Sequence, residues 1–139
     1  MSKSNTFENE MLLLFFNAVA IAGLAQDHSA PVALELSLHT ADPGEAGTQL
    51  STEATYTGYA RITAARTNGV WTVTGSQVVN AGELAFPECT AGSNVITHWA
   101  VGQVGSDTIR YYGALTASRT IDAGEVPRFP AGSLQINED

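Results

Sequence analysis

The first 25 residues carry apolar side chains at helical spacing. They recur every three or four positions in two adjacent stripes, one of Phe7, Met11, Leu14, Phe15, Ala18 and Ala22 and one of Leu12, Phe16 and Val19. Such spacing predicts an amphipathic helix. Asn5 is placed to cap its first turn, with Glu8 three residues later as in a capping box, and Gly23 is a suitable residue for its end.

The predicted helix is apolar around most of its circumference, and one covering sheet buries only one side of a helix. Two interpretations follow. The helix lies in the core over a sheet, or its remaining face packs against another subunit. The residues expected to make such assembly contacts are Phe7, Met11, Leu12, Phe15, Phe16 and Val19.

After Pro31 the apolar and polar residues alternate, which indicates half-buried β-strands. The clearest predicted strands are residues 32–39, 59–66, 70–74, 95–104 and 109–115, with shorter ones at 77–79, 83–86, 119–121, 126–129 and 134–136. Asn68-Gly69 predicts a hairpin between residues 59–66 and 70–74. The Gly105-Ser106-Asp107 turn predicts that residues 109–115 pair back on 95–104.

Short strands separated by turn residues every ten positions or so indicate an all-β architecture. The predicted fold is therefore mainly β, an antiparallel, jelly-roll-like β-sandwich with one N-terminal α-helix. A length of 139 residues favours a single domain. Within it, residues 1–27 form the helix and an arm, and residues 31–139 form the sandwich.

Charge and cysteine content narrow the possible functions. Fourteen acidic residues face six basic ones, for a formal net charge of −8. This disfavours nucleic acid and anionic membranes, which bind clustered Lys and Arg. The single cysteine, Cys89, excludes an internal disulfide. The apolar run of residues 11–25 is short for a membrane span, and the acids before it are atypical of a signal peptide.

The sequence shows no motif for catalysis or metal binding. It has neither a G-x-S-x-G nucleophile turn nor a phosphate-binding glycine loop. His39, Asp42 and Glu45 lie close in sequence, but calcium takes six to eight oxygen ligands. Asp42-Pro43-Gly44 is typical of a turn, so Asp42 and Glu45 are expected at a solvated rim. We therefore predict no catalytic residue, no metal, no cofactor and no enzymatic activity.

Several motifs in a fixed order resemble a known family. They are LSLHTADP at residues 36–43, GYAR at 58–61, ITHWAVGQ at 96–103, YYGAL at 111–115 and DAGEVPRFPAGSLQI at 122–136. Together they resemble a family of small tailed-bacteriophage virion structural proteins, often labelled tail-fibre-like. The alanine-rich ITAARTNG segment and the strongly apolar helix depart from that pattern.

The resemblance implies a structural protein on the outer surface of the virion, made in the host cytoplasm. The favoured role is a head decoration or cement protein that stabilises the capsid. The alternatives are a tail-fibre-associated or minor tail protein and, further, a carbohydrate-binding module. Expected partners are the protein itself, as a homo-oligomer such as a trimer, the major capsid protein and tail proteins. A contact between the residue 42–58 loop and a neighbouring subunit stays open.

Overall fold

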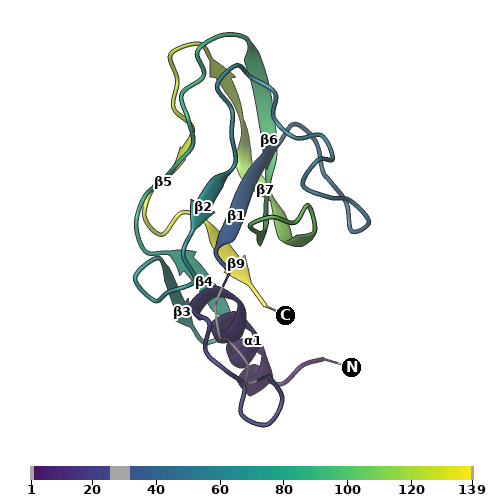
Figure 1. The fold of residues 1–139 in the computed structure, drawn as a ribbon, viewed down its shortest axis with the longest axis vertical. Coiled ribbons are helices and arrows are strands. Elements are labelled where there is room, and N and C mark those ends of the chain that lie inside the picture. The colour runs from purple at the N-terminus through teal and green to yellow at the C-terminus, as the bar shows by residue number, and fades with distance from the viewer. Residues whose placement is uncertain (1, 26–31, 139) are drawn as a thin grey trace. The chain divides into compact units, whose positions relative to one another are not determined.

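The computed structural model describes residues 2–25 and 32–138, and it confirms the mainly β, antiparallel fold with one helix near the N-terminus (Figure 1). The elements are α1 (Asn5–Asn17), β1 (Leu34–His39), β2 (Ile62–Ala64), β3 (Trp71–Thr74), β4 (Gln77–Asn80), β5 (Leu84–Ala85), β6 (Ser93–Gln103), β7 (Ile109–Asp122), β8 (Arg128–Phe129) and β9 (Gln135–Asn137).

The chain divides into two compact units. Unit 1 comprises Met1–Ala33, Ala65–Leu84 and Phe129–Asp139, and unit 2 comprises Leu34–Ala64 and Ala85–Arg128. The short strands β5 and β8 pair with each other in a separate two-stranded sheet. The single domain stays a prediction, and its expected boundaries at residues 27 and 31 lie outside the described residues.

The helix α1 begins one residue earlier and ends six residues sooner than predicted. Ser4, not Asn5, is the N-cap, and its hydroxyl accepts a hydrogen bond from the Phe7 N–H (3.3 Å). The helix ends at Asn17 because the next residue, Ala18, takes the left-handed conformation with φ of 54°. At this length α1 is too short to cross a membrane, and no other helix in the described part of the chain would span one.

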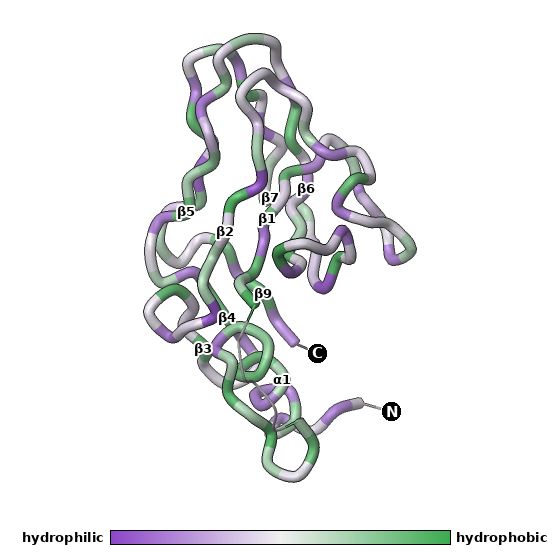
Figure 2. Tube along the Cα trace, in the orientation of Figure 1, coloured by the Kyte–Doolittle hydropathy of each residue, from purple (hydrophilic) through white to green (hydrophobic). Residues whose placement is uncertain are grey.

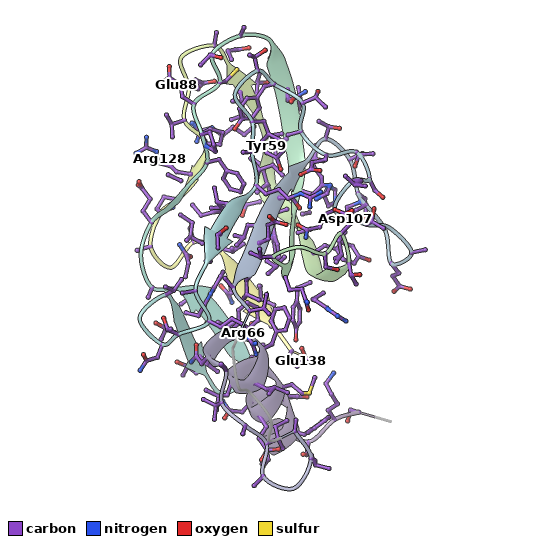
Figure 3. The ribbon with its side chains drawn as sticks, viewed as in Figure 1. Tyr59, Arg66, Glu88, Asp107, Arg128 and Glu138 are labelled. Carbon is purple, nitrogen blue, oxygen red and sulfur yellow. The ribbon has the colours of Figure 1, made fainter. Side chains whose placement is uncertain are left out.

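Arg66 explains why the helix stops at Asn17. Its guanidinium donates hydrogen bonds to the carbonyls of Leu14 and Phe15, the latter at 2.6 Å (Figure 3). In a continued helix these carbonyls would accept from the N–H groups of residues 18 and 19. Arg66, some fifty residues away in sequence, donates to them instead. The spacing of apolar residues within the helix does not predict this contact.

The core of unit 1 forms between α1 and the sheet β3-β4-β9. Leu12 and Phe16 are completely buried, and the Phe16 ring lies 4.9 Å from the ring of Trp71. Leu12 and Phe16 of the second predicted stripe therefore face the sheet, whereas Val19, which lies beyond the end of α1, is exposed. The first stripe is half-buried within α1, where no residue from Phe7 to Asn17 is exposed.

The hairpin predicted at Asn68-Gly69 is wrong. β2 pairs with β1 in unit 2, whereas β3 pairs with β4 through the turn at Gly75, whose φ is 60°. A type I′ turn requires positive φ at both central residues. Neither Asn68 nor Gly69 has one, so this dipeptide forms an ordinary loop turn.

Unit 2 is built on a four-stranded sheet with the order β2-β1-β6-β7. The predicted pairing of β7 with β6 across Gly105 is confirmed, and β7 extends further than expected, to Asp122. Residues 115–118 of β7 face the single residue Thr97 of β6, which makes a wide bulge. A bulge interrupts the open edge that a long outer strand would otherwise offer to another strand.

Candidate functional site

Residues 36–61 carry the first two family-like motifs and end at Arg61, whose side chain binds three carboxylates. The Arg61 guanidinium binds both carboxylate oxygens of Glu53, with Nε to Oε1 at 2.7 Å and Nη2 to Oε2 at 2.8 Å. Its Nη1 lies 2.9 Å from Oδ1 of Asp107 and 3.3 Å from Oε2 of Glu35. We call these four residues the Arg61 cluster.

The Arg61 cluster joins three parts of unit 2 and is partly buried, with Asp107 at its exposed side. Glu35 lies on β1, Glu53 on the loop after it, and Asp107 in the turn between β6 and β7. The side chains of Arg61 and Glu53 are only 16% and 15% exposed. The hydrogen bonds that Arg61 donates to Glu53, and then those to Asp107 and Glu35, raise the pKa of Arg61. The guanidinium is thus permanently charged and holds the loop against the sheet.

Tyr59 connects the Arg61 cluster to β1. Its hydroxyl donates to Oε1 of Glu53 (2.9 Å) and accepts from the Leu38 N–H (3.1 Å). The ring contacts Tyr56 edge-on and stacks on Phe86, with centroid distances of 5.3 and 6.4 Å. Burial raises the pKa of Tyr59 far above its ordinary value, so the phenol stays protonated. Tyr59 and Arg61, the two large side chains of the GYAR motif, therefore anchor the loop that follows β1.

Ser37 and His39 form a pair that resembles a nucleophile with its base. Ser37 Oγ lies 2.8 Å from His39 Nε2, and His39 Nδ1 lies 2.7 Å from the Ser51 carbonyl. Because a carbonyl only accepts, we assign the ring proton to Nδ1, and the Ser37 hydroxyl then donates to Nε2. Both residues have no exposed surface. A substrate has no access to this hydroxyl, so the pair stabilises the interior.

We expect His39 to make stability depend on pH. Burial of the ring lowers the pKa of His39 from 6.5 and is the largest effect. The Ser51 carbonyl and Glu53 raise the pKa by less, and Arg61 and His98 lower it further. The unfolded chain then binds a proton that the folded chain excludes. Stability is therefore complete above about pH 6.5 and falls as the pH drops below it. Urea unfolding between pH 7.5 and 5.5 measures this loss.

His39→Gln is the matched variant, because its amide can donate to the Ser51 carbonyl and accept from Ser37. The substitution should reduce the pH dependence of stability between pH 7.5 and 5.5. An equal slope for the wild type and His39→Gln would contradict the prediction.

The loop after β1 is a folded corner with its acids at the surface. Asp42 Oδ1 accepts from the Gly44 N–H (2.8 Å), and both Asp42 and Glu45 are exposed. A Cβ at Gly47 would lie 2.0 Å from the Pro43 carbonyl oxygen, so only glycine fits there. Within residues 2–25 and 32–138, no three His, Cys, Asp or Glu side chains are grouped to hold a metal, and His39 is engaged elsewhere. A contact between this loop and a neighbour stays a prediction.

The six residues expected to make assembly contacts lie in different environments. Leu12 and Phe16 are in the core of unit 1, and Phe7, Met11 and Phe15 are half-buried. Val19 is exposed. Nothing in the structure tests the assembly role itself, which stays a prediction for all six.

The exposed apolar surface of unit 1 is concentrated after α1 rather than on it. Leu24 is 76% exposed and Val19 is 47% exposed, and the segment around them is apolar throughout (Figure 2). The sequence pattern missed Leu24 because a helix extended to Gly23 placed this segment inside the helical stripe. The early end of α1 instead turns it toward solvent.

The aromatic side chains are buried or half-buried. Residues 2–25 and 32–138 contain every Trp, Tyr and Phe of the chain, and none of these side chains is in the exposed class. Tyr111 and Tyr112 on β7 are half-buried. A carbohydrate-binding module, which presents aromatic rings to a sugar, stays a prediction.

Nearly the whole chain matches a known protein family. A family model described as "Podophage GP4 fiber I protein gp80" matches residues 2–137. The match includes α1, all the strands and the Arg61 cluster. No curated protein matches the sequence.

Proposed function

The chain belongs to the podophage GP4 fiber I protein gp80 family of phage virion structural proteins, and we propose that it is a structural subunit of a podophage tail fibre. The observation that carries this proposal is the family match, which runs from residue 2 to residue 137. The family description names a fibre, and this supports the tail over the head.

The use of polar groups in unit 2 supports a scaffold without catalysis. The Arg61 cluster, Tyr59 and the Ser37–His39 pair all bind groups of the chain itself. The buried or half-buried state of every aromatic side chain also supports a role within the fibre over direct recognition of a receptor sugar. We therefore propose that the protein contributes contacts between virion proteins and no chemical step.

Head decoration, the role that the sequence favours, is the competing proposal within the same virion class. An acidic outer surface suits both positions, because it does not attract the phage genome. Tail proteins are the partners in the first case and the major capsid protein in the second. The family description supports the tail, and a direct measurement of position separates the two.

The test is to locate the protein in purified particles. Particles are separated into heads and tails, each fraction is quantified by mass spectrometry, and intact particles are labelled with antibody and gold for electron microscopy. We expect the protein in the tail fraction and the label on the fibres. Label distributed over the head lattice would establish decoration instead, and absence from purified particles would refute a virion role.

Self-association is a separate proposal with its own measurement. Light scattering of the purified protein at several concentrations and one fixed salt concentration gives its mass in solution. A homo-oligomer, such as the trimer, would have a multiple of the 14.6 kDa chain mass. A monomer at the highest concentration would contradict self-association without affecting the location in the particle.

A further inference from the structure

The turn before β3, residues 67–71, contains the one asparagine of the sequence that precedes a glycine. We call it the Asn68 turn, and both Asn68 and Gly69 are exposed in it. The other asparagines precede Thr, Glu, Ala or Val. An asparagine amide lies one carbon from its own main chain, so the backbone nitrogen of the next residue can attack it and close a five-membered ring. Glycine favours this attack because it has no Cβ beside the nitrogen.

The groups that would react take no part in the hydrogen bonds of the Asn68 turn. The Thr67 carbonyl accepts from the Val70 N–H at 3.1 Å and from the Trp71 N–H at 3.0 Å. In the described part of the chain, neither the Asn68 amide nor the Gly69 N–H makes a hydrogen bond. The amide and the nitrogen that must meet are therefore not held apart by bonds of their own.

The space around the Asn68 turn is open. A Cβ built at Gly69 would meet only the Thr67 hydroxyl oxygen, at 3.8 Å, which is an ordinary van der Waals contact. Exposed loops with few contacts open locally at a small cost in free energy. The turn can therefore supply the backbone rotation at Asn68 that ring closure requires.

Two other asparagine side chains are held in place by the fold. Asn80 is completely buried, and its amide nitrogen donates to the Pro130 carbonyl at 2.9 Å. The Asn94 side-chain oxygen accepts from the Tyr56 N–H at 2.8 Å, and the branched residue Val95 follows it. Both amides are fixed away from the nitrogen that would attack them, so they are internal controls within the same molecule.

We propose that Asn68 is a site of spontaneous deamidation and isoaspartate formation. The Gly69 nitrogen loses its proton to solvent and forms a bond to Asn68 Cγ, while the Cγ–Nδ2 bond breaks and ammonia leaves. Water then opens the resulting succinimide. Breaking the bond from nitrogen to Cγ gives aspartate, and breaking the bond to the main-chain carbonyl carbon gives isoaspartate. In total, one amide and one water become one carboxylate and one ammonium ion, and no oxidant or reductant is needed.

The product changes the Asn68 turn in two ways. Each modified chain gains one negative charge in addition to its net charge of −8. Isoaspartate also adds one carbon to the main chain between Thr67 and Val70, whose hydrogen bond closes the turn. This inference goes beyond the proposed fibre role and does not depend on it, because it rests on the chemistry of the turn alone.

Mass spectrometry of the purified, folded chain tests the proposal. The protein is incubated at pH 7 and at pH 8, digested, and compared with a sample digested at the start, and isoaspartyl methyltransferase labels the isoaspartate. We expect conversion at Asn68 while Asn80 and Asn94 stay unchanged. The rate should rise severalfold from pH 7 to pH 8, because the attacking nitrogen must first lose its proton. Conversion of Asn80 or Asn94 as fast as Asn68 would overturn the inference.

Gly69→Ala is the matched variant, because the Asn68 turn has room for a methyl group and Gly69 has no positive φ. It should slow conversion at Asn68 by about tenfold or more, since the added Cβ crowds the attacking nitrogen. The thermal midpoint should stay that of the wild type, because the position is exposed. Equal rates in the variant and the wild type would overturn the proposed attack.

Incubation of the wild type in guanidinium chloride separates the effect of the fold from that of the dipeptide. Because the turn opens easily, we expect the rate in the folded chain to lie within about tenfold of the rate in the unfolded chain. An unmodified Asn68 in the folded chain, after complete conversion in denaturant, would show that the fold protects this residue and would overturn the inference.

Discussion

Replacing Arg61 with alanine should lower the stability of unit 2 by about 3–5 kcal/mol. The substitution leaves the carboxylates of Glu53 and Glu35 near each other with little access to water, because both side chains are mostly buried. Asp107 is half-exposed and adds little to this cost. Urea unfolding at pH 7.5 measures the loss.

Two further arginine variants separate the Arg61 cluster from a general effect of charge. Arg110→Ala removes an exposed arginine on β7 and should change stability by less than about 0.5 kcal/mol. Arg61→Lys retains the charge but cannot bind Glu53 through two parallel hydrogen bonds, so an intermediate loss is expected. A loss below about 1 kcal/mol in Arg61→Ala would show that the cluster is not what holds the loop.

Phe16→Ala should lower the stability of unit 1 by about 3–5 kcal/mol. Phe16 is completely buried between α1 and β3, and its removal leaves a cavity against the ring of Trp71. Trp71 lies in unit 1 and Trp99 in unit 2. In a Trp99→Phe background the fluorescence of Trp71 therefore reports on unit 1, and the reverse variant reports on unit 2.

Val19→Ala is the control for the helix region, because Val19 is exposed just beyond the end of α1. It should change stability by no more than about 0.5 kcal/mol. If Phe16→Ala and Val19→Ala had equal effects, the packing of α1 on the sheet would not be the main contribution to the stability of unit 1.

The strands were predictable where a local pattern determines them. Alternation located β1, β6 and β7, and the glycine turn between the last two gave their pairing. The helix end and the Asn68-Gly69 hairpin were wrong because distant residues decide them. Arg66 binds the last carbonyls of α1 from outside the helix, and the chain changes units between β2 and β3.

The candidate site was predictable only in part for the same reason. The GYAR motif pointed to residues 58–61, but the carboxylates that Arg61 binds come from positions 35, 53 and 107. No spacing rule connects positions so far apart in sequence. The exposure of Leu24 was not predicted, because the helix was expected to continue to Gly23. Exposure depends on where the backbone turns and not on the hydropathy of the residue.

The two ends of the chain both belong to unit 1, where Lys3 and Glu138 form an ion pair at 2.8 Å. A short peptide linker should therefore connect the ends with little distortion. New ends opened in the exposed loop at Asp42 would then give a circular permutant. A fusion partner would then sit on unit 2 in that permutant and on unit 1 in the unpermuted chain, and labelling of each on the particle would show which unit stays accessible after assembly.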